Sequence, residues 1–310
     1  MFGGKSFEPE RDIPDLSGKV ILVTGGNTGL GQEAILQLAK HKPAHIYMGA
    51  RTASKAEQAI KEIKAVVPDA PVSHIPLDLT SFESISACAK QFNEKESRLD
   101  ILYNNAGIMA TPMGLTKEGY EIQFGTNHMG HFLLTRLLLP KMEKTADEPN
   151  ADVRIVNVSS EGHRFAPNGH LVTDAESLGQ MMTWRRYGMS KLANILHARE
   201  LARRYPKITA VSIHPGVIKT NLYTPMSETN FILKFSTAIF GAVARVALPD
   251  VPAGAKNQLW AGTCPKSEVR SGAYYTPIGK EKQKGWVDWS DDLARKLWDY
   301  SEAEVQQKGY

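Results

Sequence analysis

This sequence has few cysteines, only a small excess of positive over negative charge, and no long apolar run. The 310 residues include two cysteines, Cys88 and Cys264, which form no CxxC pair and no metal-ligand spacing, so neither a disulfide framework nor a metal site is expected from them. Free thiols are typical of a reducing compartment and favour a cytoplasmic location. The formal net charge is only +4 and no long basic block occurs, so nucleic-acid binding is not expected either.

No apolar segment is long and unbroken enough to predict a membrane span. A spanning helix needs roughly 18 or more consecutive apolar residues, whereas the best candidate, residues 231–248, is interrupted by Lys234 and Arg245 and is predicted to be an amphipathic helix. Residues 1–15 are polar and lack the apolar core of a secretory signal.

Short apolar runs alternate with longer amphipathic segments along most of the chain. Strands are predicted at residues 19–24, 44–50, 72–77, 99–103, 153–158 and 208–213, with a short edge strand at 272–276. Helices are predicted at residues 29–40, 53–67, 81–93, 117–142 and 187–204. This alternation indicates an α/β fold, a doubly wound parallel sheet covered on both faces. No composition shift marks a second domain, so a single domain is expected over residues 1–310, with a substrate-side lid at 221–255.

A glycine-rich turn joins the first predicted strand to the first predicted helix, with the sequence TGGNTGLG at residues 24–31. Glycines permit a tight turn and a close approach of the backbone to a ligand, and the N-terminus of the following helix favours a pyrophosphate. A dinucleotide is therefore the predicted ligand, and a purely structural turn is the alternative. The expected contacts are Gly25, Asn27, Thr28, Gly29, Leu30 and Gly31.

The end of the second predicted strand indicates which dinucleotide binds. An NAD site usually has Asp or Glu about 20 residues past the glycines, where it holds the ribose 2′-hydroxyl. Arg51 occupies this place, Lys55 follows it, and no acid precedes Glu57. A guanidinium pairs well with a 2′-phosphate. The sequence therefore predicts NADP(H), with a solvated surface arginine as the alternative interpretation.

Tyr187 and Lys191 form a YxxxK pair, a spacing that places both side chains on one face of a helix. Reduction of a carbonyl by hydride requires a proton for the oxygen. A phenol has an ordinary pKa of about 10, and a neighbouring ammonium lowers that pKa because it favours the phenolate. Tyr187 is therefore predicted to transfer the proton, and Lys191 to lower the pKa of Tyr187.

Together these motifs resemble the short-chain dehydrogenase/reductase family, and within it the branch of retinol dehydrogenases. The resemblance rests on the TGxxxGxG spacing, on the NNAG sequence at residues 104–107, on YxxxK, and on the run from Phe124 to Thr135. It implies a Rossmann-type fold and hydride transfer between a nicotinamide and a ketone, aldehyde or alcohol.

The resemblance also implies roles for single residues. Ser160 would orient the substrate oxygen, Asn127 would distort the long helix and hold a water that relays protons, and Lys191 would also bind the nicotinamide ribose. The other cofactor contacts that it implies are Asp78, Leu79, Asn105, Ala106, Gly107, Tyr187, Pro215, Gly216, Ile218 and Thr220. Taken alone, Asp78 could equally cap the helix that begins near Ser81.

Three details of the pattern qualify these roles. Ser159 is expected to point away from Ser160 because strand side chains alternate. Ser160 precedes Tyr187 by 27 residues, which is longer than is usual in the family, and residues 164–186 resemble an insertion of the retinol dehydrogenase branch. His128 and His131 have no carboxylate at a spacing suited to a shared metal, so packing or the anchoring of a loop is favoured over metal binding.

The apolar stretch at residues 230–246 favours an apolar substrate, such as a lipid, retinoid or polyketide-like carbonyl. Packing on the core and peripheral contact with a membrane surface are the alternatives for this stretch. Two other functions stay open: an NAD-dependent alcohol dehydrogenase, and a non-enzymatic NADP-binding sensor, which the retention of all four catalytic residues disfavours. The resemblance further implies that a homo-oligomer could pair through the long helices after the fourth and fifth strands.

Overall fold

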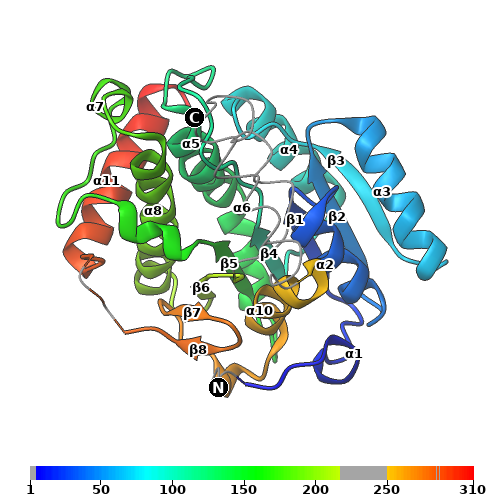
Figure 1. Cartoon of the computed structure of the whole chain (residues 1–310). Helices are drawn as coiled ribbons and strands as arrows, with labels where there is room; N and C mark the ends of the chain where they lie inside the picture. Colours follow the sequence, from blue (N-terminus) through cyan, green and yellow to red (C-terminus); the bar gives the residue numbers. More distant parts are fainter. Residues whose placement is uncertain (1–4, 217–249, 284, 286) are drawn as a thin grey trace.

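An eight-stranded sheet forms the centre of the molecule (Figure 1). The computed structural model describes residues 5–216, 250–283, 285 and 287–310. The strands are β1 (Val20–Thr24), β2 (His45–Ala50), β3 (Val72–Pro76), β4 (Ile101–Asn104), β5 (Arg154–Val158), β6 (Thr209–Ile213), β7 (Tyr274–Thr276) and β8 (Lys280–Glu281). Their order is β3-β2-β1-β4-β5-β6-β7-β8, parallel from β3 to β7, with β8 antiparallel to β7. The predicted single-domain, doubly wound parallel sheet is confirmed.

Helices cover both faces of the sheet (Figure 1). One face carries α2 (Gly29–Ala39), α3 (Ala53–Val66) and α10 (Val251–Thr263), and the other carries α4 (Phe82–Lys95), α6 (Gly130–Ala146), α8 (Thr183–Arg204) and α11 (Asp291–Gln307). The shorter elements are α1 (Pro9–Asp12), α5 (Ile122–Phe124), the π-helix η1 (Gly125–Met129), the 3₁₀ helices η2 (Glu161–Phe165) and η4 (Lys266–Glu268), and α7 (Ala175–Gly179).

The strands are apolar at nearly every position because both of their faces are buried. In β1, Leu22 packs into the core that contains α4, α6 and α8, whereas Ile21 and Val23 pack into the core that contains α2 and α10. All five positions of β1 are buried. The continuous apolar runs of the sequence therefore correspond to strands that separate two cores.

The long helix predicted at residues 117–142 is wrong at both ends. An isolated bridge between Leu115 and Glu121 precedes it, and the carboxylate of Glu121 then caps α5 by accepting from the backbone N–H of Gln123 and Phe124. The helix continues through η1 and α6 to Ala146. The side-chain cap explains the later start, since a capping carboxylate satisfies the free N–H groups of a helix N-terminus.

Two smaller boundaries also differ from the prediction. The helix expected to begin at Tyr187 begins at Thr183, so Tyr187 lies one turn inside α8. The short edge strand predicted at residues 272–276 corresponds to β7, which begins at Tyr274. It is not the edge of the sheet, because β8 pairs with its outer side. Neither change alters the order of the parallel strands.

Part of the predicted lid lies outside the described residues. This applies to residues 221–249, which contain the apolar stretch 230–246, and to the predicted cofactor contacts Ile218 and Thr220. Residues 250–255, the last part of the predicted lid, form the cap and the start of α10: Asp250 accepts from the N–H of Ala253 at 3.0 Å, and α10 packs on α2. Within the described ranges, no helix is both long and apolar enough to cross a membrane.

The C-terminal helix α11 packs against α8 and α6. Trp298 is buried, and its ring lies 5.1 Å from that of Phe132 and 5.9 Å from that of His197. Arg136 on α6 pairs with Glu302 on α11 at 2.8 Å. Helix α11 therefore covers part of α8, one of the long helices through which pairing of two copies was predicted.

Truncation of Trp298 should weaken the whole fold. Trp298→Ala leaves a cavity between α6, α8 and α11 and should lower the free energy of unfolding by about 3–5 kcal/mol. Trp298→Phe keeps a ring in the same place and should cost clearly less. Urea unfolding followed by circular dichroism measures both changes, and a loss below about 1 kcal/mol for Trp298→Ala would show that α11 is not part of the cooperative core.

Candidate active site

The glycine-rich turn forms a cradle at the end of β1. Gly25 and Gly29 have φ angles of +65° and +54°, which side chains with a Cβ rarely adopt. A Cβ on Gly31 would clash with the carbonyl oxygen of Gly25 and lie 2.6 Å from Asn105 Nδ2. Gly29 also begins the 11-residue helix α2. The backbone is thus exposed beside a helix N-terminus, which fits the pyrophosphate of a dinucleotide.

The loop after β4 lies directly against this turn. Thr24 Oγ1 accepts from the backbone N–H of Asn105 at 3.0 Å and of Ala106 at 2.9 Å, and Asn105 Nδ2 donates to the carbonyl oxygen of Thr24 at 2.8 Å. A Cβ on Gly25 would lie 3.0 Å from the Cα of Ala106. The small residues of the NNAG sequence therefore let the two loops meet.

Arg51 follows β2 directly and is exposed, and Lys55 is exposed in the first turn of α3. Among the described residues, Arg51 makes no ion pair, so its guanidinium is available to a phosphate. Asp78 accepts from the N–H and the hydroxyl of Thr80. The cap of α4 is Ser81, whose Oγ accepts from Ser84 N–H. The alternative role of Asp78 as the helix cap is therefore wrong.

Leu79 and Gly216 lie in segments that follow β3 and β6 at the same edge of the sheet. The carbonyl oxygen of Leu79 lies 2.5 Å from the place that a Cβ on Gly130 would take, so α6 can approach only because residue 130 is glycine. Gly216, after Pro215, has a φ of +100°. Both segments follow the carboxyl ends of strands, where open α/β sheets bind ligands.

Tyr187 and Lys191 lie on α8 and are both buried. Lys191 Nζ donates to the carbonyl oxygen of Val158 at 3.0 Å and lies 5.7 Å from the centre of the Tyr187 ring. Burial lowers the pKa of Lys191 to about 8. A Cβ on Gly107 would lie 3.2 Å from both Lys191 Nζ and Asn127 Oδ1. The structure thus brings Tyr187, Lys191, Asn127 and the NNAG loop together.

The two serines at the end of β5 point in different directions, as predicted. Ser159 Oγ is buried and donates to the carbonyl oxygen of Lys191 at 2.7 Å. Ser160 Oγ accepts from Gly162 N–H at 3.0 Å. A Cβ on Gly162 would lie 3.3 Å from Ser160 Oγ and 2.7 Å from Tyr187 Cε1, so Ser160 and Tyr187 approach each other across Gly162.

Asn127 lies within the π-helix η1. Its Nδ2 donates to the carbonyl oxygen of Ile108 and to Ser190 Oγ, both at 2.9 Å, and its Oδ1 accepts from Ile108 N–H at 2.9 Å. A π turn widens a helix locally and occurs often at functional sites. The helix is thus distorted where the resemblance implied it, and the side chain connects the NNAG loop to α8.

Comparison with known proteins agrees with this geometry. A family model described as short chain dehydrogenase matches residues 19–230. The chain is 40% identical over 309 residues to the short-chain dehydrogenase/reductase drtF of Aspergillus calidoustus, with 96% of each chain covered. The chain belongs to the short-chain dehydrogenase/reductase family.

Other members of the family show the same relationship. Retinol dehydrogenase 11 of Mus musculus is 36% identical over 291 residues, which cover 92% of this chain and 86% of the relative. This similarity confirms the predicted resemblance to retinol dehydrogenases. The crystal structure of an uncharacterised protein from Mycobacterium paratuberculosis has a TM-score of 0.73 at 28% identity and covers 97% of this chain and 98% of its own.

The sequence motifs did not point to several residues that lie close to Tyr187 or to the Ser160 turn. Met109, Ala110 and Trp184 form an apolar cluster with Tyr187. A signal was present, because Trp184 precedes Tyr187 by one helical turn and Met109 follows the NNAG loop closely. The phenol of Tyr274 also lies 3.4 Å from Glu161 Oε1, next to the Ser160 turn, and no motif pointed to it.

A buried ion pair that the sequence did not indicate braces the same region. Arg186 Nε lies 3.2 Å from Glu121 Oε1, and Arg186 Nη2 donates to the carbonyl oxygen of Thr111 at 3.1 Å. Gln123 Oε1 accepts from Ala110 N–H at 2.8 Å. These contacts fix residues 110–111 against the first turn of α8, where Arg186 directly precedes Tyr187.

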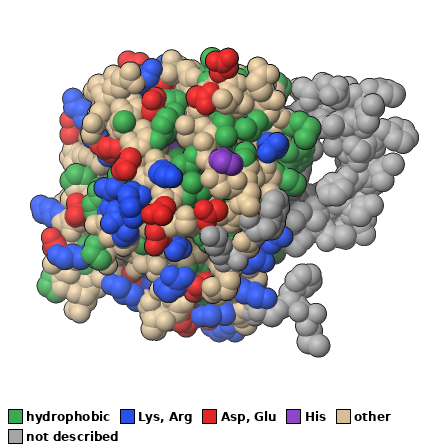
Figure 2. Space-filling model, turned by 90° about the vertical axis from the view of Figure 1, so that its left-hand side faces the viewer, with side chains coloured by type: hydrophobic (Ala, Val, Ile, Leu, Met, Phe, Trp, Pro, Cys, Tyr) green, Lys and Arg blue, Asp and Glu red, His purple; other side chains and the backbone are tan. Residues whose placement is uncertain are grey.

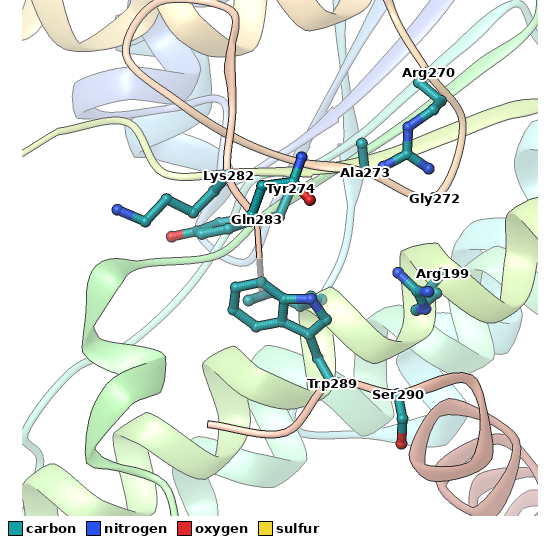
Figure 3. A pocket seen from close by; sticks show the side chains of 10 residues that line it. Arg199, Arg270, Gly272, Ala273, Tyr274, Lys282, Gln283, Trp289 and Ser290 are labelled. Atoms are coloured by element: carbon teal, nitrogen blue, oxygen red, sulfur yellow. The ribbon is translucent and has the colours of Figure 1, made fainter. Parts of the chain in front are cut away.

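A cavity of about 190 Å³ lies between β7, α8 and the start of α11 (Figure 3). Its arginines already have carboxylate partners, since Arg199 pairs with Asp291 and Arg270 with Glu281. Lys282 extends away from both arginines (Figure 3).

The described residues contain no group of three or more His, Cys, Asp or Glu side chains that could hold a metal ion. On the face drawn in Figure 2, acidic and basic side chains are interspersed.

Five histidines are buried, and burial lowers the pKa of each: His128, His131, His163, His197 and His214. The pKa falls to about 4 for His131 and His214 and to about 3 for His197. These imidazoles are therefore neutral in the folded protein at physiological pH.

The fold should lose stability as the pH falls below neutrality. An unfolded chain has histidines of pKa about 6.5, so between about pH 6.5 and 4 the unfolded state binds protons that the folded state excludes, and the free energy of unfolding decreases. His197→Phe removes one such group and should reduce the slope by up to about 1.4 kcal/mol per pH unit. Urea unfolding at pH values of about 7.5, 6 and 5 measures the slope. An unchanged slope in His197→Phe would contradict the assignment.

Proposed function

We propose that this chain is an NADP(H)-dependent oxidoreductase that interconverts an apolar ketone or aldehyde and the matching alcohol. The observation that carries the proposal is the convergence of Tyr187, Lys191, Ser160 and Asn127 beside the glycine cradle. The nicotinamide, when bound, supplies or accepts the hydride at the substrate carbon. The remaining work falls to side chains of this chain.

Tyr187 would give its phenolic proton to the substrate oxygen during reduction and take it back during oxidation. Lys191, buried with its ammonium close to the Tyr187 ring, favours the phenolate that this transfer leaves. Ser160, across Gly162 from Tyr187, would hold the same oxygen. Asn127 would anchor the water that returns a proton toward Lys191. Two donors aimed at one oxygen stabilise the charge that develops there.

The preference for NADP(H) is supported by charge at the end of β2. Arg51 and Lys55 are exposed at this position, and the next acid in the sequence is Glu57. Two cations would attract a 2′-phosphate, whereas an NAD site would have an acid here.

An apolar substrate is supported by the wall around Tyr187. Met109, Ala110 and Trp184 contact the tyrosine and would surround the reacting carbon with apolar surface. The name of the mouse relative, a retinol dehydrogenase, fits an alcohol of this kind. The cytoplasmic location and pairing with a second copy stay predictions.

Reversal of charge at residue 51 tests the cofactor. Arg51→Asp removes a charge-assisted hydrogen bond and adds repulsion, so the Kd for NADPH should rise about 30-fold or more while that for NADH falls. Fluorescence titration measures both values. Lys64→Asp is the matched control, because it makes the same charge change at the far end of α3. Equal NADPH binding by the wild type and Arg51→Asp would exclude Arg51 as the phosphate ligand.

Removal of the phenol tests the reaction. Tyr187→Phe should lower kcat for reduction of a long-chain aldehyde by about 10²–10⁴-fold, because the proton donor is lost. The Kd for NADPH should stay within about twofold of wild type, since the ring and its packing remain. Tyr205→Phe, at the other end of α8, is the control. Full activity of Tyr187→Phe would sink the proposed mechanism.

A series of aldehydes of increasing chain length tests the substrate class. Each added methylene that is buried against the apolar wall should raise kcat/KM, by at most about fourfold per CH₂. Steady-state rates with NADPH give the values. A flat or falling kcat/KM with length would count against an apolar substrate.

A further inference from the structure

His131 lies in the first turn of α6 and contacts two of the motifs through its two ring nitrogens. Its Nε2 lies 2.8 Å from Thr24 Oγ1, and its Nδ1 lies 3.0 Å from the main-chain oxygen of Asn127. The ring is 2% exposed. One buried side chain thus bridges the glycine-rich turn and the π-helix.

The protons on this bridge can be assigned by counting donors and acceptors. Thr24 Oγ1 uses both of its lone pairs to accept from Asn105 and Ala106, so it can take part in a further bond only by donating its own proton. Two acceptors lie within reach of this proton: His131 Nε2 at 2.8 Å and the main-chain carbonyl oxygen of Tyr103 at 3.3 Å, so the histidine is nearer. Nε2 therefore accepts, the ring is neutral, and Nδ1 carries the hydrogen that is donated to Asn127.

The same path continues to the helix that carries the YxxxK pair. The side chain of Asn127 donates to Ser190 Oγ at 2.9 Å, and Ser190 Oγ donates to the main-chain carbonyl oxygen of Tyr187 at 2.8 Å. Ser190 directly precedes Lys191 on α8. A continuous set of hydrogen bonds therefore runs from the cofactor turn through His131 and Asn127 to the backbone of Tyr187.

We propose that His131 is a positioning residue for hydride transfer: it keeps the glycine-rich turn, the NNAG loop and the catalytic helix at fixed relative positions by holding Thr24 and Asn127 at the same time. This inference rests on the proposed function, because the two parts that it aligns are the cofactor site and the Tyr187 hydroxyl. A misplacement of reacting groups by about 1 Å can cost about 10²-fold in rate. The loss should therefore appear in kcat more than in cofactor binding.

Three substitutions separate the two hydrogen bonds. His131→Phe keeps the ring and loses both bonds, and should lower kcat about 30-fold or more while changing the Kd for NADPH less than threefold. His131→Gln retains an acceptor for Thr24, and His131→Asn retains a donor for Asn127. Each should lower kcat less than His131→Phe does.

His128→Phe is the matched control. His128 has the same residue type, is equally buried one turn earlier in the chain, and contacts Ser301 of α11 instead of the motifs. His128→Phe should lower stability but leave kcat within about twofold of wild type. An equal loss of kcat in both variants would show that general loosening of the core explains the effect, and would overturn the proposal. A kcat for His131→Phe within twofold of wild type would overturn it too.

Hydrogen exchange gives a readout that does not depend on the substrate. The amides of Asn105 and Ala106, which donate to Thr24 Oγ1, should exchange at least tenfold faster in His131→Phe than in His128→Phe under native conditions. Absence of NADPH binding by the wild-type protein would overturn the proposed function, whereas unchanged exchange at these two amides would overturn the role of His131. The two failures are therefore distinguishable.

Discussion

The hydroxyl of Thr24 is the contact on which the arrangement of the active site depends. It lies at the carboxyl end of β1, where the loops after β1 and β4 leave the sheet side by side. Two partly buried backbone N–H groups of the NNAG loop would lose their acceptor if this hydroxyl were absent, and unpaired groups of this kind are costly. Because Thr24 satisfies both, the glycine turn and the NNAG loop can meet closely, with Gly25 against Ala106 and the Asn105 amide bonded to the Thr24 carbonyl oxygen.

A second constraint is the burial of the Lys191 ammonium. Val158 supplies a carbonyl oxygen at 3.0 Å, and burial lowers the pKa of Lys191 to about 8. A charge in such surroundings acts strongly on its neighbours, because little solvent screens it. Gly107 leaves the space in which Lys191 and Asn127 approach the NNAG loop. The electrostatics of the site therefore depend on small residues as much as on charged ones.

Much of this site could be predicted because its motifs are local. Each motif follows a strand, and parallel strands bring their carboxyl ends to one edge of the sheet. Spacing along one helix was enough to place Tyr187 beside Lys191. Contacts that only the fold creates were missed: Glu121 with Arg186, and Thr24 with His131. The two members of each pair are far apart in sequence and share no pattern. The start of the long helix was also missed, because the cap from Glu121 overrides the apolar periodicity.

The sequence by itself determined the succession of strands and helices along the chain, the family and the identity of the motif residues, because apolar periodicity and short-range spacing encode them. The tertiary structure decided which side chains share hydrogen bonds, which serine faces Tyr187, and how α11 closes over α8. These features depend on contacts between segments that are distant along the chain. A pattern of single residues carries no record of such contacts, since many partners could satisfy the same donor or fill the same space.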